Sequence, residues 1–324
     1  MNMEKIPTVS LIGINHAFGE RIIENSEIEK KYGLPDGWIL EKTGKEKGHA
    51  WNNGPESPIE ASLKCLNFLL EQNNLDKSDI KAVFGTTNPI TVNGVTDEIS
   101  LTQKFIRKAG FSKNVFVSDE GFGCGGSAVG MNSMCSWLKN QPVGTYAVYI
   151  TQDWSTRMVK DRNVEALFSD AVSVSLWTND DKGIMEVTDI FSANSTIADK
   201  SLGIVGGYWE MNGKEVSEAA SSVPAPIAEK LGINLKDYDI VPHQPNLRLF
   251  ETIEKKYNVN LYKRVAKEHG NPTCSGAFIA LEKRLEERNS DVISLNKEKD
   301  ILVMPFGAGG VGGFILRNKK HNND

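Results

Sequence analysis

Residues 74–89, NLDKSDIKAVFGTTNP, and residues 233–246, INLKDYDIVPHQPN, follow one pattern. In each stretch a turn with acidic and basic residues leads through Asp-Ile into a short β-branched run, and a polar turn near a proline ends it. A helical pattern precedes both, SLKCLNFLLEQ in the first case and IAEKLG in the second. Two similar segments far apart in one sequence indicate that the same structural unit is repeated. The pair therefore predicts a duplicated protein.

The segments after each repeat also match in order. Residues 101–134 and residues 247–285 both run from a helical pattern through a glycine and a strand to a second turn, which opens a further helix. In this register residues 122–124, Phe-Gly-Cys, correspond to residues 269–271, His-Gly-Asn. Strands that alternate with helices are typical of an α/β protein with buried sheets.

We expect two duplicated halves built from βαβ-type units. The first, residues 1–180, would carry Cys124, and the second, residues 181–324, would carry His243 and Asn271. Duplicated halves tend to meet across a pseudo-two-fold axis, and turns at equivalent strand ends then converge. The three side chains are therefore expected to share one site.

The bulk composition is that of an ordinary globular protein. The chain has 324 residues, of which 40% are hydrophobic and 24% charged, and its formal net charge is −5. Nucleic-acid binding usually shows as clustered positive charge, so no nucleic-acid partner is expected. The apolar run near the N-terminus, Leu11 to Ile14, is too short for a secretory signal or a membrane span. We expect a cytoplasmic protein that does not enter a membrane.

Cys124 lies in the stretch GFGCGGSAVG, residues 121–130. The chain has no Cys-x-x-Cys pair, and four cysteines in 324 residues do not form a disulfide framework. The stretch itself contains no other metal ligand. A strand-to-helix turn is expected here, and a thiol at a helix N-terminus has a depressed pKa because the helix dipole and free N–H groups favour the thiolate. Such a thiolate is a strong nucleophile. A small buried thiol in a tight turn is the structural alternative.

His243 and Asn271 lie in two further turns, VPHQPNLRLF (241–250) and EHGNPTCSG (268–276). Each residue alone is compatible with a structural role, since Asn-Pro is also an ordinary turn signal. Together with Cys124 they could form, hold and redirect a thioester. The glycine-rich stretch MPFGAGGVGGFILR (304–317) lacks the context of a phosphate loop. It is better suited to placing a backbone N–H against a developing oxyanion.

These segments resemble the thiolase superfamily and, within it, β-ketoacyl-acyl-carrier-protein synthase III. The resemblance extends in order along nearly the whole chain and implies a layered αβαβα sandwich with a catalytic Cys-His-Asn triad at Cys124, His243 and Asn271. The other segments that carry it are DGWILEKTG (36–44), DRNVEALFSDAVSVSL (161–176), NGKEV (212–216) and PFGAGG (305–310).

The resemblance also implies a reaction. Cys124 takes an acyl group from acyl-CoA, and the backbone N–H groups of Cys124 and Ala308 hold the oxyanion. His243 and Asn271 then stabilise the enolate that forms when a malonyl thioester on an acyl carrier protein loses CO₂. No metal or redox cofactor is expected, because acyl-CoA is a substrate.

Further binding residues follow from the resemblance. It implies a homodimer that uses the loop near residues 90–99. The residues implied for substrate and CoA binding are Trp38, Lys42, Arg162 and Asn93, and those implied for carrier-protein binding are Arg248, Lys255 and Lys256. Lys42 replaces a usual arginine, and Asn93 replaces a phenylalanine that the partner subunit usually supplies. These departures favour a specialised fatty acid or polyketide-type pathway.

Three other functions remain open at this stage. One is a thiolase-fold acyltransferase that forms an ester or amide without decarboxylation. Another is a cysteine hydrolase that uses Cys124 and His243, which would need a site open to water. The third is a non-catalytic binding subunit, against which the complete triad argues.

Overall fold

The computed structural model describes residues 8–87, 91–92, 95–96, 100–121, 123–193, 202–205, 208–290, 298–307 and 310–318. In the first half the elements are β1 (Ser10–Phe18), β2 (Arg21–Glu24), α1 (Asn25–Tyr32), α2 (Trp38–Thr43), β3 (Lys47–Ala50), α3 (Glu56–Gln72), β4 (Ile80–Thr87), β5 (Thr91–Val92), β6 (Val95–Thr96), α4 (Leu101–Ala109), β7 (Phe116–Glu120), the 3₁₀ turn η1 (Gly123–Gly125), α5 (Gly126–Lys139), β8 (Tyr146–Gln152), η2 (Thr156–Met158), α6 (Arg162–Glu165) and β9 (Ala171–Thr178).

The second half continues the alternation of strands and helices. Its elements are β10 (Met185–Ala193), β11 (Leu202–Val205), β12 (Tyr208–Met211), α7 (Gly213–Ala220), α8 (Pro224–Leu231), η4 (Leu235–Asp237), β13 (Asp239–Pro242), α9 (Leu247–Tyr257), α10 (Arg264–His269), η5 (Thr273–Ser275), α11 (Gly276–Asn289), β14 (Ile301–Met304), β15 (Phe306–Gly307) and β16 (Gly310–Asn318).

The strand order shows the duplication directly. The central sheet runs β13-β14-β16-β10-β1-β9-β8-β4-β7. In the first half β4 is parallel to β8, and β9 is antiparallel to both β8 and β1. In the second half β13 is parallel to β14, and β16 is antiparallel to both β14 and β10. The strands β1, β4, β8 and β9 therefore correspond to β10, β13, β14 and β16.

The two half-sheets are joined at one edge. Strand β1 pairs with β10 through Ser10 and Glu186 and through Leu11 and Met185, so the strands form one continuous sheet. The predicted boundary at residue 180 falls between the end of β9 and the start of β10. The division into two domains at that residue stays a prediction.

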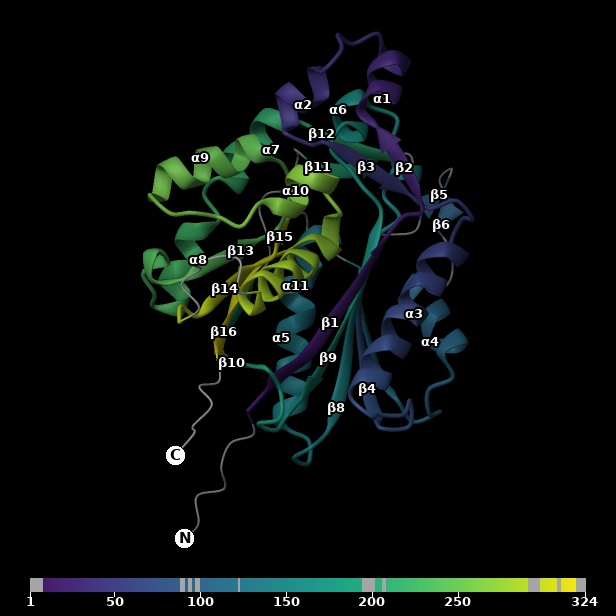
Figure 1. Ribbon diagram of the computed structural model, residues 1–324, viewed down its shortest axis with the longest axis vertical. Coiled ribbons are helices and arrows are strands. Elements are labelled where there is room, and N and C mark those ends of the chain that lie inside the picture. Colours follow the sequence, from purple (N-terminus) through teal and green to yellow (C-terminus); the bar gives the residue numbers. More distant parts are fainter. Residues whose placement is uncertain are drawn as a thin grey trace.

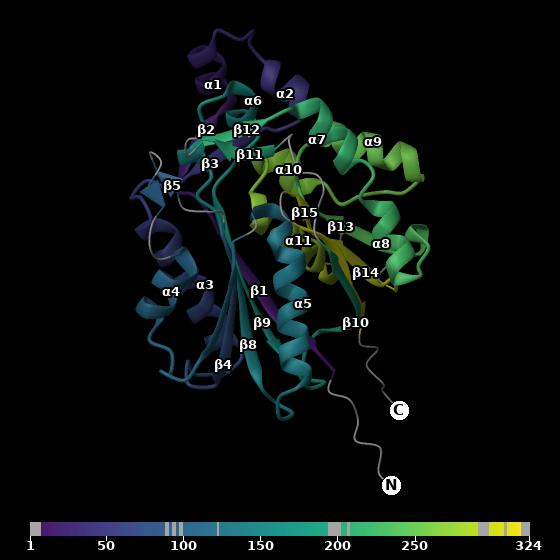
Figure 2. The same ribbon diagram turned by 180° about the vertical axis from the view of Figure 1, so that it is seen from behind.

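Helices cover the sheet in layers (Figures 1 and 2). On the outer face of the first half, α3 and α4 pack through Leu66 and Phe105. On the outer face of the second half, α8 and α9 pack through Ile227 and Phe250. Helices α5 and α11 lie between the half-sheets, where their apolar residues share a core with β1, β8 and β14. This arrangement confirms the predicted αβαβα sandwich.

One detail of the predicted duplication is wrong. Cys124 is the central residue of η1, and the central residue of η5 is Cys274. A helix of 14 residues follows each turn, starting at Gly126 and at Gly276. Cys124 therefore corresponds to Cys274 and not to Asn271. Runs of small residues look alike in any register, so only the backbone reveals the three-residue shift.

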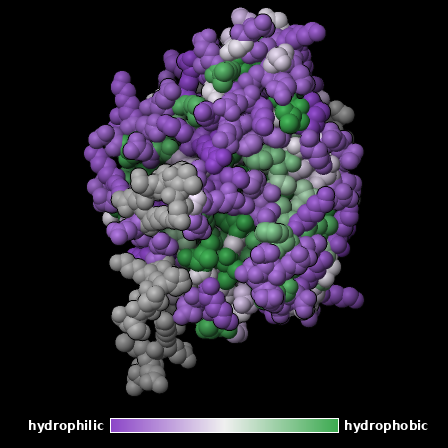
Figure 3. All heavy atoms as spheres, in the orientation of Figure 1, coloured by the Kyte–Doolittle hydropathy of each residue, from purple (hydrophilic) through white to green (hydrophobic). Residues whose placement is uncertain are grey.

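The surface in the orientation of Figure 1 is mainly polar, with apolar residues reaching it near the centre (Figure 3). Among the helices in the described ranges, none is both long and apolar enough to span a bilayer. The cytoplasmic location stays a prediction.

Candidate active site

The Cys124 turn connects β7 to the buried helix α5. Its glycines are needed because another segment lies against them. A Cβ on Gly125 would stand 2.1 Å from the Gly310 carbonyl oxygen, and a Cβ on Gly307 would stand 2.4 Å from Cβ of Cys124. Gly125 itself has an ordinary helical φ of −81°. Tertiary contact with the β15–β16 pair, and not backbone strain, therefore requires glycine at this position.

His243 directly follows β13, and several contacts hold its turn. Its backbone N–H donates to the carbonyl of Met304 at 2.8 Å. The buried side chain of the next residue, Gln244, donates to the Tyr262 carbonyl at 2.8 Å and accepts from the Ala266 N–H at 3.1 Å. The imidazole packs edge-on against the ring of Phe306, with centroids 5.3 Å apart. The sequence pattern strand-His-Gln-Pro thus fixes the direction of the imidazole.

Asn271 is held by its backbone, which leaves its side chain available. Its N–H donates to the Leu167 carbonyl at 2.9 Å, and its own carbonyl accepts from the Ser169 N–H at 3.0 Å. The side chain is only 5% exposed. Its Oδ1 atom has no hydrogen-bond partner among the described residues. A buried amide oxygen without a partner is costly, so this end of the side chain is suited to bind a substrate group. The oxygen and nitrogen of an amide exchange places when it turns over, which would present the N–H donors instead.

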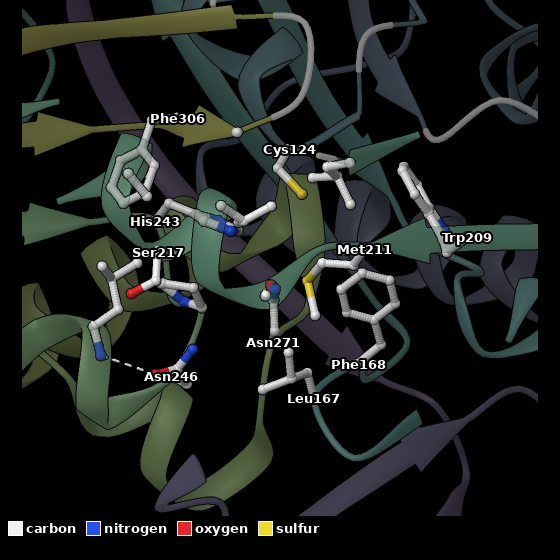
Figure 4. A pocket seen from close by; sticks show the side chains of 17 residues that line it. Cys124, Leu167, Phe168, Trp209, Met211, Ser217, His243, Asn246, Asn271 and Phe306 are labelled. Carbon is white, nitrogen blue, oxygen red and sulfur yellow. Dashed lines mark hydrogen bonds between the residues drawn. The ribbon is translucent and has the colours of Figure 1, made fainter. Parts of the chain in front are cut away.

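Cys124, His243 and Asn271 line one cavity of about 130 Å³. Figure 4 shows that the three side chains converge on this cavity from three separate segments. The wall is mostly apolar, formed by Leu167, Phe168, Leu202, Trp209, Met211, Val216, Ala220, Leu249 and Phe306. Such a narrow apolar site strengthens electrostatic interactions within it and limits access of water.

The pKa of the Cys124 thiol is raised and not lowered as predicted. Burial raises the pKa of the Cys124 thiol above its ordinary value, and the nearby Asp153 carboxylate raises it further. The predicted depression by the helix N-terminus is therefore wrong for the free protein, because burial has the larger effect. Burial also lowers the pKa of His243 to about 3, while a backbone hydrogen bond with Thr273 acts in the opposite direction. The site holds a neutral thiol and a neutral imidazole, which can accept the thiol proton.

The residues predicted to bind CoA lie apart from this cavity. Trp38 of α2 and Arg162 of α6 come together, with the guanidinium 6.0 Å from the indole centroid. Lys42 forms an ion pair with its neighbour Glu41 at 2.6 Å. None of the three belongs to the cavity wall formed by the described residues. Two further predicted residues, Asn93 and Ala308, lie outside the described residues.

The residues predicted to bind a carrier protein share the exposed face of α9. Arg248, Lys255 and Lys256 are exposed, whereas Leu249 and Phe250 on the same helix are buried. The Arg248 guanidinium donates to the backbone carbonyl of Glu41 on α2 at 3.0 Å and 3.3 Å. The helix starts at the cavity, because Asn246 and Leu249 line it. This face, which is basic overall although Glu251 is also exposed on it, therefore lies next to the site.

Two residues near the site were not singled out from the sequence. Asn246 caps α9 by accepting from the Leu249 N–H at 2.9 Å, shown as the dashed line in Figure 4. Asp153, at the end of the apolar strand β8, contacts the start of α11. Polar residues at strand ends were the signal that identified His243, and the same signal applies to Asp153.

Comparisons with known proteins agree with the fold. No family model matches the chain. The β-ketoacyl-acyl-carrier-protein synthase III of Clostridium acetobutylicum is 27% identical over 336 residues, which cover 95% of this chain and 98% of that protein. The one from Coxiella burnetii is 24% identical over 323 residues, covering 94% and 97%. The crystal structure of the priming β-ketosynthase from the R1128 polyketide biosynthetic pathway aligns with a TM-score of 0.80 at 19% identity, covering 98% of each chain. The chain thus has a thiolase-like fold and is similar over nearly its whole length to β-ketoacyl-acyl-carrier-protein synthase III, as the sequence resemblance indicated.

Proposed function

We propose that this protein is a condensing enzyme of the β-ketoacyl-acyl-carrier-protein synthase III type. It transfers an acyl group from acyl-CoA to Cys124 and then performs a decarboxylative Claisen condensation with a malonyl thioester. The observation that carries the proposal is the convergence of Cys124, His243 and Asn271 on one narrow apolar cavity. The names of the relatives with similar sequences support it.

Acylation uses the neutral thiol–imidazole pair. As Sγ of Cys124 bonds to the thioester carbon, His243 accepts the thiol proton. The oxyanion forms at the N-terminus of α5, where backbone N–H groups have no intrahelical partner. The bond between carbon and the CoA sulfur then breaks, and the proton returns from His243 to the departing CoA thiolate.

Condensation uses the two nitrogen-bearing side chains. A malonyl thioester enters, and its carbonyl oxygen accepts hydrogen bonds from His243 and Asn271. The carbon–carboxylate bond breaks, CO₂ leaves, and the electron pair forms an enolate that these hydrogen bonds stabilise. The enolate carbon attacks the acyl carbon, and the Cys124 thiolate departs. The proposed reaction needs no metal or redox cofactor.

The partners of the reaction are part of the proposal. The basic face of α9, with Arg248, Lys255 and Lys256, would attract an acidic carrier protein to the mouth of the site. The pathway is proposed to be a specialised fatty acid or polyketide-type pathway. The priming ketosynthase among the structural neighbours is compatible with this assignment.

We also propose a homodimer. Strand β7 ends the path of the sheet, and no described strand pairs with its outer edge. Its Phe116 is 44% exposed and stacks on Trp137 of α5, with ring centroids 5.5 Å apart. An exposed edge strand with an apolar residue favours pairing with a second copy. Light scattering at micromolar concentration should give the mass of a dimer, and a monomer would contradict this part. In the loop predicted to cross the interface, residues 93–94 and 97–99 lie outside the described residues.

The test measures both half-reactions on the same protein. Incubation with a panel of acyl-CoAs should add one acyl mass to Cys124 by intact mass spectrometry. Labelled malonyl-carrier protein should then release ¹⁴CO₂ and yield a 3-oxoacyl product. Acylation without CO₂ release for any carrier would instead indicate an acyltransferase that forms esters or amides. Rapid loss of the acyl group to water would indicate a hydrolase.

A further inference from the structure

Asp153 connects the two halves of the protein at the active site. It directly follows β8 of the first half and is completely buried. Its carboxylate contacts η5 and the start of α11 in the second half. Oδ2 accepts from the Ser275 N–H at 2.8 Å, and Oδ1 accepts from the Thr273 hydroxyl and from the Cys274 N–H at 3.3 Å. One carboxylate thus occupies the N-terminal position of the second central helix.

These contacts fix the chain close to Asn271. Thr273 is only two residues beyond Asn271, so the position of the carboxylate determines where the turn begins. The nucleophile turn lies against the same segment, because the Ser127 hydroxyl of α5 donates to the Cys274 carbonyl at 2.9 Å. A displacement of Asp153 would therefore be transmitted to both Cys124 and Asn271.

The negative charge of Asp153 also affects the two cysteines of these turns. Its carboxylate raises the pKa of both Cys124 and Cys274, in each case after burial as the larger cause. Burial raises the pKa of Asp153 itself to about 7, against the hydrogen bonds from Ser275 and Cys274, which lower it. Among the described residues, the titratable groups near it include Cys124 of η1 and Cys274 of η5. His243 lines the same cavity as Cys124.

We propose that Asp153 is a positioning residue for both half-reactions, because its carboxylate fixes the turn carrying Asn271 and the same segment holds the helix that begins after Cys124. The proposal deepens the proposed function, because it gives one carboxylate a role in both half-reactions. The ionised carboxylate accepts stronger hydrogen bonds and so holds the turn for condensation. The protonated carboxylate lets Cys124 ionise more easily and so favours acylation.

The first test follows the alkylation of Cys124 by iodoacetamide between pH 5 and 10, measured on the Cys124 peptide by mass spectrometry. Only the thiolate reacts, so the rate reports the ionisation of this thiol. In the wild-type protein the logarithm of the rate should rise with pH, flatten around pH 7 as Asp153 ionises, and rise again. Asp153→Asn should give a single straight rise, displaced to lower pH by on the order of one unit at pH 8.

A matched control is Asp170→Asn. Asp170 is also completely buried, and burial raises its pKa to about 6. Its carboxylate accepts hydrogen bonds from the Thr156 N–H and hydroxyl and from the Trp51 N–H. It is not among the causes of the pKa shift of Cys124. This variant should keep the wild-type break near pH 7. The same pH dependence of alkylation in both variants would show that the Asp153 charge does not affect Cys124. A wild-type rate that rises without flattening near pH 7 would show the same. The wild-type measurement decides even where Asp153→Asn does not fold.

The second test separates positioning from charge. Asp153→Asn places an amide group against the N–H groups of η5, so we expect CO₂ release from malonyl-carrier protein to fall about tenfold, while Cys124 is still acylated. An unchanged ratio of CO₂ release to acylation would refute the positioning role. A wild-type protein that never releases CO₂ would refute the proposed function alone, because the alkylation profile does not depend on condensation.

Discussion

The two central turns of this protein have the same backbone and different surroundings. In each, a 3₁₀ turn of three residues with a central cysteine precedes a helix of 14 residues. Cys124 faces the cavity together with His243. Cys274 is 1% exposed, and its Sγ lies 3.1 Å from the Asp153 Oδ1 atom and 3.3 Å from the Thr86 carbonyl oxygen.

The difference shows how duplication can give one cysteine that lines the cavity and one that does not. At the start of α11 the carboxylate of Asp153 already occupies the free N–H groups. No carboxylate of the described residues is hydrogen-bonded to the start of α5, where glycine at 125 leaves room for Gly310 of β16. The first helix N-terminus can therefore receive a substrate oxygen, whereas the second stabilises the turn that carries Asn271.

The largest expected effect compares the two cysteines. Cys124→Ala should lose acylation by on the order of 10⁴–10⁶-fold, because no nucleophile remains at the cavity. Cys274→Ala should still be acylated at Cys124, since its thiol lies outside the cavity. Intact mass spectrometry with a reactive acyl-CoA gives both results. Acylation of the Cys124→Ala protein on any other cysteine would contradict the comparison.

The next effect separates the half-reactions. Asn271→Ala should still be acylated but should lose CO₂ release by on the order of 10²–10³-fold, since one donor to the enolate oxygen is removed. Cys124→Ala should show the reverse, with CO₂ still released and no condensed product formed. Labelled CO₂ and acyl-enzyme mass, followed together, test this. Equal losses of both steps in Asn271→Ala would mean that the residue holds the fold and not the enolate.

The third effect concerns the glycines. Gly125→Ala should destabilise the protein by roughly 1–3 kcal/mol through overpacking, and acylation should fall, because its Cβ would meet the backbone of Gly310. The equivalent position in the second turn is Ser275, so the local backbone accepts a side chain. Gly121→Ala is the control, because a Cβ at that position would have no atom of the described residues within 4 Å, apart from its chain neighbours. Urea unfolding of both variants measures the difference.

The last effect is a gain of stability and concerns Lys45, which lies behind the second turn beside Gly270. Its Nζ is buried and has no hydrogen-bond partner in the described part of the chain, and burial lowers the pKa of the amine from 10.5 to about 8. Lys45→Met should therefore stabilise the protein by about 1–3 kcal/mol at pH 7. The exposed Lys113→Met should change little.

The pH dependence of this gain tests its cause. Between pH 8 and 10.5 the unfolded chain binds more protons at Lys45 than the folded one, so wild-type stability should rise with pH in that window. The advantage of Lys45→Met should shrink correspondingly, as measured by urea unfolding at pH 7 and pH 10. A constant advantage would mean that better packing, and not the buried charge, is responsible.

Sequence reasoning succeeded where chemistry follows local pattern. The turns at Cys124, His243 and Asn271 were visible as polar or glycine-rich stretches beside apolar runs, and the structure places all three at one cavity. The strand that the duplication predicts before Asn271 is wrong, because helix α10 precedes this residue. The direction of the Cys124 pKa shift was not predictable, because it depends on how deeply the turn is buried. Asp153 was missed because its partners lie about 120 residues away along the chain.

By itself the sequence determined the alternation of strands and helices, the existence of a duplication, and the three side chains that could handle a thioester. These properties follow from hydrophobic periodicity and residue chemistry, which act over a few residues. Only the tertiary structure decided that Cys124 corresponds to Cys274, that Gly125 must be glycine, and that Asp153 holds the second turn. Each of these depends on contacts between segments brought together by packing of the two halves, and close packing is a property of the folded whole.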